Sequence, residues 1–288
     1  MPKRPRVSDE YAEFLCRAVA SGKSGRGVSC LCRPELWQEA SEMFAPLERV
    51  AVISGFFVPA AGSPETDGPG GAVILARAFL EQGRTAEIWT DALCSDALRQ
   101  CGEAVGFPSS LVKTPKIDEI LDTYDPQGII FTERLGRAAD GRYYNASQKD
   151  ITKWTAPLDE LALLSAGRGI KTLGIGDGGN EAGMGCFYDE LSTRLPDFAN
   201  SLSIVKTDIA LPVDVSNWGA YAFTAALSRV WGAWRGHREG EERAMLEALC
   251  GCHAVDGISH RCEPSVDGFS LAVHEALASQ LREIWGIL

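Results

Sequence analysis

Short apolar runs alternate with longer amphipathic stretches along most of this chain. The apolar runs are rich in β-branched residues and bounded by polar or glycine residues, a pattern that predicts buried strands. We expect strands over residues 49–58, 86–90, 128–132, 171–175 and 209–213.

Between these runs, apolar residues recur at the three- and four-residue spacing of a helix. This spacing predicts helices over residues 70–82, 93–105, 158–166, 217–234 and 270–287. The segment before residue 46 is also expected to be helical, because Tyr11, Phe14, Leu15 and Ala18 share one helical face.

Alternation of apolar strands with helices indicates a parallel sheet covered on both faces. We therefore predict a doubly wound α/β fold with a mainly parallel sheet, helices on both faces and a helical N-terminal extension. In domain terms, residues 1–46 form the extension and residues 47–288 a single α/β domain that would carry any catalytic site.

Charge and hydropathy narrow the classes of partner. The formal net charge is −11, and no broad basic patch is present, so nucleic acid is not an expected partner. No run approaches the roughly 20 apolar residues that span a bilayer, so no membrane partner is expected. The first residues lack the apolar core of a secretory signal, and we expect a soluble, cytoplasmic protein.

Nine cysteines argue against a fully paired disulfide framework, because the count is odd. The group Cys250, Cys252, His253, His260 and Cys262 does not match a familiar zinc spacing. We interpret these cysteines as free thiols.

Polar residues concentrate where the predicted strands end, and in parallel sheets such ends meet at one edge. Glu65 and Asp67 follow the first strand, within a Glu-Thr-Asp-Gly-Pro string that exceeds what capping the next helix requires. Arg134, Arg137 and Arg142 follow the strand over residues 128–132. The planar guanidinium group of arginine suits a carboxylate or phosphate ligand. The alternative is that these three arginines lie in a surface loop and pair with Asp140 and Glu133.

A glycine-rich loop, residues 176–185, follows the strand over residues 171–175 and carries Asp177, Asn180 and Glu181. Hard oxygen ligands in such a loop suit Mg²⁺, Mn²⁺ or Ca²⁺. The loop meets the dinucleotide fingerprint only loosely, and Asp177 would repel a pyrophosphate, so no nucleotide cofactor is expected.

Two further segments allow more than one interpretation. In residues 213–221, Ser216 or Asn217 is expected to cap a helix whose N-terminus would suit an anion. The alternative is that this helix start binds no ligand and that Trp218 and Tyr221 simply pack in the core. The Gly/Ser-rich segment SGKSGRGVS, residues 21–29, lacks the full phosphate-loop pattern and is interpreted as a connector.

Several of these motifs together resemble the D-glutamate cyclase family. They are SGFFVPAAGSPETDGPGG, ERLGRAADGRYYN, GIGDGGNEAGMG, DVSNWGAY and CHAVDGISHRCEPSVDG, in this order between residue 54 and residue 268. The resemblance implies conversion of D-glutamate to 5-oxo-D-proline with loss of water. In larger animal homologues the domain lies behind another domain, which leaves open whether this chain acts alone.

That reaction needs a base, an acid and stabilisation of an oxyanion. The candidate catalytic residues are Glu65, Asp67, Asp177 and Glu181, with Asp177 and Glu181 as candidate ligands of Mn²⁺ or Mg²⁺. The candidate binding residues for a small dicarboxylate substrate are Arg134, Arg137, Arg142, Asn180 and Asn217.

Other functions fit the same loops. One is a metal-dependent hydrolase or lyase acting on another small carboxylate or phosphate, and another is a non-catalytic module that binds an acidic metabolite. The sequence contains seven tryptophans. Tryptophans such as Trp231 and Trp234 are expected either to be buried in a homo-oligomer interface or to complete the core.

Overall fold

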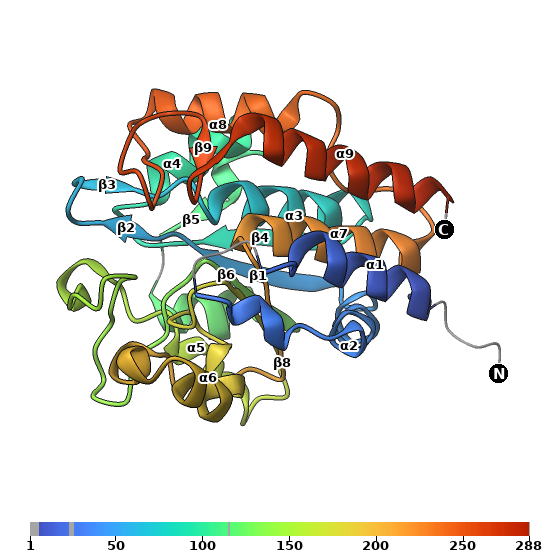
Figure 1. Ribbon diagram of the computed structural model, residues 1–288. Helices are drawn as coiled ribbons and strands as arrows, with labels where there is room; N and C mark the ends of the chain where they lie inside the picture. The colour runs from blue at the N-terminus through green and yellow to red at the C-terminus, as the bar shows by residue number, and fades with distance from the viewer. Residues whose placement is uncertain (1–5, 23–25, 115, 288) are drawn as a thin grey trace.

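A central sheet of six parallel strands organises the molecule (Figure 1). The computed structural model describes residues 6–22, 26–114 and 116–287. The sheet order is β5-β4-β1-β6-β7-β8. The strands are β1 Arg49–Ser54, β4 Thr85–Trp89, β5 Val112–Lys113, β6 Gly128–Thr132, β7 Lys171–Gly176 and β8 Ile209–Pro212.

The order in which the chain adds strands to the sheet changes direction between β1 and β6. From β1 the chain builds outward through β4 to β5, then returns to pair β6 with β1 and builds the other half through β7 to β8. In open α/β sheets, ligands bind at such a switch point, beyond the carboxyl ends of the strands. The topology therefore places a site at the loops that follow β1 and β6.

The predicted strands are confirmed, with one correction. Residues 49–58 were expected to form one strand, but the chain leaves the sheet after Ser54 and turns at Gly55, whose φ is 110°. It then forms a small antiparallel hairpin of β2 (Phe57–Val58) and β3 (Ser63–Pro64). A second small hairpin, β9 (Ser265–Val266) with β10 (Phe269–Ser270), lies near the C-terminus.

Helices cover both faces of the sheet, as predicted. The helices are α1 Asp9–Val19, α2 Pro34–Phe44, α3 Pro69–Glu81, α4 Ser95–Glu103, α5 Glu160–Ser165, α6 Tyr188–Arg194, α7 Ser216–Trp231, α8 Glu241–Gly251 and α9 Leu271–Ile287. The short helical turns are η1 Val28–Leu31, η2 Ser109–Leu111, η3 Glu119–Tyr124, η4 Thr152–Trp154, η5 Met184–Phe187 and η6 Pro196–Ser201.

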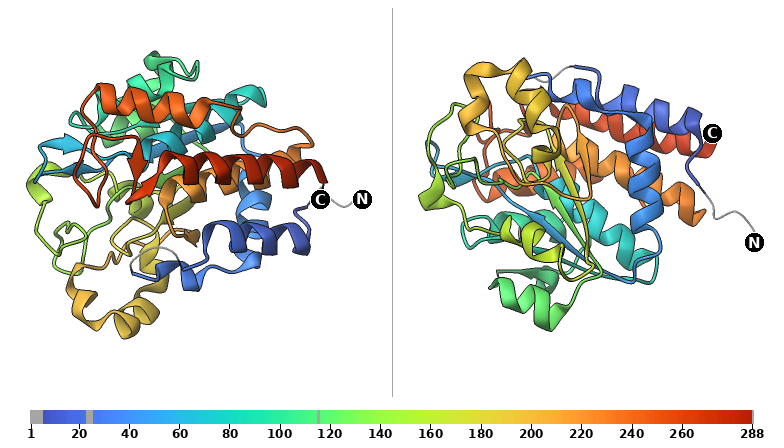
Figure 2. Two further views of the ribbon diagram at one scale, coloured as in Figure 1. Left: turned by 45° about the horizontal axis from the view of Figure 1, so that its top comes forward. Right: turned by 90° about the horizontal axis from the view of Figure 1, so that it is seen from below.

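Alternating side chains of each strand supply the two cores. Val50 and Val52 of β1 pack with α3 and α7, whereas Ala51 and Ile53 pack with η3 and α5. This two-sided burial explains why the strands are apolar throughout. The helical N-terminal segment joins the first core: α1 contacts α7 and α9, which run beside it (Figure 2). The division at residue 46 stays a prediction.

Within the described residues, no helix is both long enough and apolar enough to cross a membrane.

Helices α3 and α7 pack closely and cap each other. The side chain of Asn217 in α7 accepts hydrogen bonds from the amides of Gly68 (3.1 Å) and Gly71 (2.6 Å) at the start of α3. In return, Asp67 just before α3 accepts from the amides of Ser216 (2.9 Å) and Asn217 (2.8 Å) at the start of α7. The two N-termini are thus fixed at the switch point, side by side.

We predict that Gly71→Ala destabilises the protein. A Cβ at residue 71 would lie 2.7 Å from the Cβ of Ala220 and 3.1 Å from the Cα of Asn217, so α3 would have to move away from α7. Overpacking costs about 1–3 kcal/mol, offset by about 1 kcal/mol of helix propensity. Urea unfolding should show a lower free energy of unfolding than for Gly251→Ala, where an added Cβ meets open space at the end of α8. A Gly71→Ala variant at least as stable as wild type would contradict the close packing.

Candidate active site

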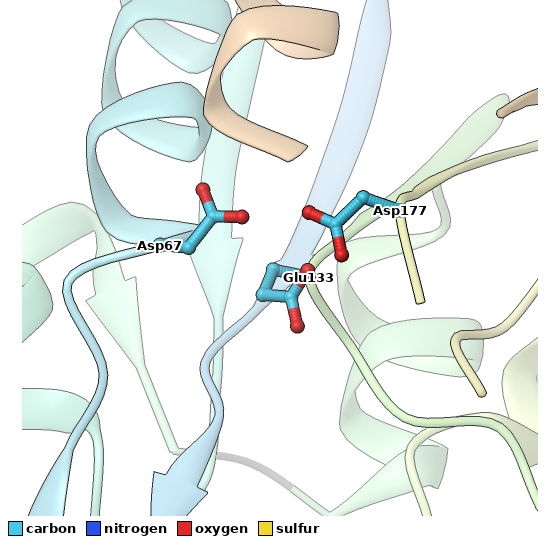
Figure 3. Close-up of side chains that lie close together, drawn as sticks. All are labelled: Asp67, Glu133 and Asp177. Atoms are coloured by element: carbon cyan, nitrogen blue, oxygen red, sulfur yellow. The ribbon is translucent and has the colours of Figure 1, made fainter. Parts of the chain in front are cut away.

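Three carboxyl groups converge at the switch point. Asp67 comes from the loop after β1, Glu133 from the end of β6 and Asp177 from the end of β7. Each offers one oxygen, and these oxygens all lie within 4.8 Å of one another. Figure 3 shows the three side chains pointing toward one another from separate segments. We call Asp67, Glu133 and Asp177 the acid cluster.

The N-terminus of α7 holds the acid cluster together. The amide of Ser216 donates to Asp67 Oδ2 and Asp177 Oδ2, both at 2.9 Å, and its hydroxyl donates to Glu133 Oε2 at 2.7 Å. The unpaired amides and the dipole at a helix N-terminus favour negative charge. One turn of helix therefore orients all three acids.

The prediction that Ser216 or Asn217 is the cap of α7 is wrong. Val215 occupies the cap position, and no side-chain cap hydrogen bond is present there. The reason is that Asp67 and Asp177, from other loops, already accept from the first amides of the helix. The protein's own carboxyl groups thus occupy the predicted anion site.

Backbone conformation brings Asp67 and Glu133 together. Gly68 has a φ of 96°, and a Cβ there would lie 2.8 Å from the Cβ of Glu133. Glu133 itself has a φ of 44°, in the left-handed region that costs a non-glycine residue about 1–3 kcal/mol. Such strain is frequent at functional sites, and here it turns the Glu133 side chain toward Asp67.

The acid cluster is electrostatically crowded. Burial raises the pKa of Glu133 well above its ordinary value, and the nearby Glu181 and Asp67 raise it further. Burial likewise raises the pKa of Asp177, with Glu133 as the next cause. Three adjacent carboxylates are stable together only when protons or a cation offset their charge. An all-oxygen donor set suits a hard divalent cation such as Mg²⁺ or Mn²⁺.

Further carboxyl groups surround the acid cluster. Burial raises the pKa of Glu65 well above its ordinary value, with Asp267 as the next cause, and burial raises the pKa of Asp267 in the same way. Within the described part of the chain, no hydrogen bond engages the carboxyl group of Glu65. The carboxyl of Glu181 instead accepts from the amides of Gly178 and Gly179, both at 2.8 Å, and so fixes its own glycine-rich loop.

A cavity of about 480 Å³ opens onto these acids. Its volume is typical of small-molecule sites. Its wall includes the carboxyl residues Glu65, Glu133, Asp177, Glu181 and Asp267, the basic residues Arg26, Lys149 and His260, and Asn180. Apolar side chains such as Phe56, Val58 and Ile151 complete the wall.

The predicted catalytic acids meet at this cavity. Glu65, Asp177 and Glu181 line it, and Asp67 joins Asp177 in the acid cluster. Asp177 and Glu181 were the predicted metal ligands. Asp177 belongs to the acid cluster, but Glu181 does not; the other two members are Asp67 and Glu133. Asn180 lines the cavity and donates to the carbonyl of Tyr144 at 2.8 Å. Asn217 is buried at the start of α7, and its side chain binds the α3 backbone.

The three predicted substrate arginines point elsewhere. Arg134 is buried and donates to the carbonyls of Gly55 and Ala156 and to Asp91. Arg137 pairs with Asp159 (2.8 Å) and Glu160 (3.1 Å).

The exposed Arg142 pairs with Asp140 and Asp150. Neither it nor Arg134 nor Arg137 is among the residues that line the cavity. Their role in substrate binding stays a prediction, and this geometry does not support it.

Three residues of the site were missed by the sequence analysis. Glu133 was considered only as an ion-pair partner of the arginines, although its place directly after a buried strand matches that of the other acids. Asp267 lies in the β9–β10 turn, far along the chain from the sheet. Arg26 lies in the segment 21–29, interpreted as a connector, of which residues 23–25 lie outside the described residues.

Comparison with known proteins adds a family to this geometry. Residues 15–282 match the family described as "D-glutamate cyclase-like, C-terminal". The chain is 32% identical over 223 residues to the human protein "D-glutamate cyclase, mitochondrial". That similarity covers 70% of this chain and 36% of the human protein, so the match spans about a third of the length of that relative.

Proposed function

Because the chain belongs to the D-glutamate cyclase-like, C-terminal family, we propose that it is a lyase that converts D-glutamate to 5-oxo-D-proline with loss of water. The observation that carries the proposal is the acid cluster of Asp67, Glu133 and Asp177 at the switch point of the sheet. The similarity to the human cyclase supports the choice of substrate.

The chemistry of cyclisation sets what the site must do. The substrate ammonium loses two protons, the nitrogen attacks the γ-carboxyl carbon, and one carboxyl oxygen leaves as water carrying two protons. No net proton is consumed or released, so the site has to move protons from the nitrogen to the departing oxygen. Carboxyl groups of raised pKa suit this transfer, because they hold a proton more readily than ordinary carboxyl groups and can return it to the departing oxygen.

Glu65 and Asp267 are the residues we assign to this proton transfer. Both line the cavity, both stand outside the acid cluster, and burial raises the pKa of each. Glu65 in its ionised form takes a proton from the substrate ammonium, and in its protonated form it returns the proton to the leaving oxygen. The cavity holds the amine and the carboxyl in a ring-like pose, which supplies the proximity that an intramolecular attack needs.

The acid cluster would hold a divalent cation. Its three oxygens are close enough to share one ion, and their crowded charges favour it. When bound, Mg²⁺ or Mn²⁺ would supply Lewis-acid stabilisation of negative charge on the γ-carboxyl oxygen. The residues that would bind it are Asp67, Glu133 and Asp177, which replace the earlier expectation of Asp177 with Glu181.

We predict that this cation stabilises the fold more strongly as pH rises. Burial raises the pKa of Glu133 and Asp177, so the folded state keeps protons that the unfolded chain loses above about pH 4. The stability that these protons provide is present below that pH and is lost as pH rises toward the folded-state pKa. A cation then takes their place, contributing about 2.7 kcal/mol at one hundred times its Kd.

Thermal unfolding with and without Mg²⁺ at about pH 5 and about pH 8 measures this effect. The rise in Tm caused by the cation should be larger at the higher pH, because protons compete for the same oxygens. Glu65→Gln should keep the response, whereas Glu133→Gln should lose most of it. Equal responses at both pH values, or none in wild type, would argue against a cation at the acid cluster.

The reaction itself is tested by NMR of the purified chain with D-glutamate and, separately, with L-glutamate, with and without Mg²⁺. We expect 5-oxoproline from the D-form, at a rate that depends on the cation. Product from neither form under any condition would reject the cyclase proposal and leave the other carboxylate enzymes or a binding module as the remaining functions.

A further inference from the structure

The cavity combines many acids with few bases. Its wall carries Glu133 and Asp177 of the acid cluster together with Glu65, Asp150, Glu181 and Asp267, whereas its basic side chains are Arg26, Lys149 and His260. Lys149 and His260 are exposed, and Arg26 is half-buried. A dicarboxylate entering this cavity therefore meets one partly desolvated cation, where an ion pair is less screened by water.

Arg26 lies directly beside the acid cluster. Its Nη1 donates to the carbonyl of Gly178 at 2.6 Å, and Gly178 follows Asp177 in the chain. The same nitrogen lies 3.5 Å from Oδ1 of Asn180, and the guanidinium packs over the ring of Phe198 at 5.1 Å. These contacts hold the guanidinium at the edge of the cavity.

Part of the Arg26 guanidinium remains available for a ligand. Both of its hydrogen bonds to other described residues use Nη1. Among the residues that the structure describes, neither Nη2 nor Nε has a hydrogen-bond partner. The planar fork of an arginine binds a carboxylate through two parallel N–H donors, which a lysine does not reproduce.

Ser21 and Gly22, shortly before Arg26 in the chain, are bonded just before the helix that orients the acids. The amide and hydroxyl of Ser21 donate to Asp214 Oδ2 at 2.8 and 3.1 Å, and the amide of Gly22 donates to Asp214 Oδ1 at 3.1 Å. Asp214 is fully buried two residues before α7. The segment before α7 therefore anchors residues 21 and 22, and the start of α7 orients the acid cluster.

We propose that Arg26 binds the non-reacting α-carboxylate of the substrate, an assignment that rests on the proposed function. The γ-carboxyl group has to lie at the acids that exchange protons with it. The α-carboxylate keeps its charge throughout the reaction, so the acids repel it and the guanidinium beside Asp177 attracts it. Arg26 is a specificity-determining residue that selects substrates with a second carboxylate.

The test compares wild type with Arg26→Gln and Arg26→Lys, and uses Lys149→Gln as a control that removes a positive charge from the same cavity. For D-glutamate, Arg26→Gln should raise KM by about 10- to 100-fold, the usual effect of losing a charged hydrogen bond, with a smaller change in kcat. Arg26→Lys should recover part of the loss, and Lys149→Gln should change KM less than about threefold.

Two ligands, one with both carboxylates and one without the α-carboxylate, separate a loss of carboxylate binding from a general loss of folded protein. Glutarate keeps both carboxylates, and 4-aminobutanoate lacks the α-carboxylate. In calorimetric titrations with Mg²⁺ present, Arg26→Gln should weaken glutarate binding by the same factor and leave 4-aminobutanoate binding unchanged. Equal weakening of both ligands, or unchanged glutarate binding, would overturn the assignment.

The same titrations keep the two proposals separable. If wild type forms no 5-oxoproline but glutarate binding still depends on Arg26, the cyclase proposal fails and the carboxylate site stands. If wild type forms product and Arg26→Gln leaves KM for D-glutamate unchanged, only the Arg26 assignment fails. Should Arg26→Gln not fold, the Arg26→Lys variant answers the same question, because lysine keeps the charge but lacks the planar fork.

Discussion

Asp177→Asn is expected to lower kcat/KM for D-glutamate by about 10²- to 10⁴-fold. Asparagine keeps the size of the side chain and one oxygen that accepts from the Ser216 amide, so the start of α7 stays capped. It removes the charge of one of the three acids that would share a cation. Removing a charge from the reaction centre weakens stabilisation of the transition state, and the steady-state rate of 5-oxoproline formation measures it.

Arg142→Gln is the matched comparison for that loss. Arg142 follows β6, as Glu133 does, but it is exposed, pairs with Asp140 and Asp150, and is not among the residues that line the cavity. We expect its kcat/KM to stay within about twofold of wild type. If Asp177→Asn keeps more than about a tenth of wild-type activity, or Arg142→Gln falls as far, the acid cluster is not the reaction centre.

Asn217→Ala is expected to lower the free energy of unfolding by about 3–5 kcal/mol. The Asn217 amide oxygen accepts from Gly68 and Gly71, and its nitrogen donates to the carbonyl of Thr66 at 3.1 Å. The amide of Gly68 keeps its bond to Asp67, but the buried amide of Gly71 and carbonyl of Thr66 would each lose this partner, at a cost of about 1–3 kcal/mol apiece. Urea unfolding of the variant measures the loss.

Thr224→Ala provides the control for burial in the same helix. Its hydroxyl donates only to the carbonyl of Ala220 one turn earlier, at 2.8 Å, so its removal should cost about 1 kcal/mol. Asn217→Ala should also reduce turnover, because the helix start that it shares with Ser216 orients Asp67 and Asp177. Equal stability losses for the two variants would mean that the mutual capping of α3 and α7 contributes little.

The hydrophobic pattern predicts the sheet well because both faces of its central strands are buried. Gly128–Thr132 is buried throughout and forms β6 over that whole range. The pattern fails at residues 55–58, where Phe57 and Val58 are as apolar as β1 but belong to a separate hairpin. Helix α8 was not predicted, although Met245, Leu246 and Leu249 recur at helical spacing and are buried in the structure.

The site was only partly predictable because side-chain direction within a loop depends on distant contacts. The convergence of Asp67 and Asp177 follows from parallel strand ends, which the sequence indicates. Arg134 follows the same strand end as Glu133, yet it turns inward to Asp91 and two backbone carbonyls. No local sequence pattern distinguishes the direction of the Arg134 side chain from that of Glu133.

Long-range packing also decides which distant segments reach the cavity. Asp267 lies in the turn of the β9–β10 hairpin, and Arg26 lies shortly after Ser21 and Gly22, which donate to Asp214. Neither follows a strand of the central sheet, so a search confined to strand ends misses both. The buried carboxyl of Asp214 accepts from amides almost two hundred residues away in the chain. Local sequence spacing cannot predict such a contact.

A crystal structure of the chain grown with Mn²⁺ and glutarate tests the central claim most directly, because manganese is located by its anomalous scattering. We predict one manganese ion about 2.1 Å from oxygens of Asp67, Glu133 and Asp177, with one glutarate carboxylate beside it and the other paired with Arg26. Manganese and glutarate bound elsewhere, with the three acids still bonded only to one another and to α7, would contradict the account.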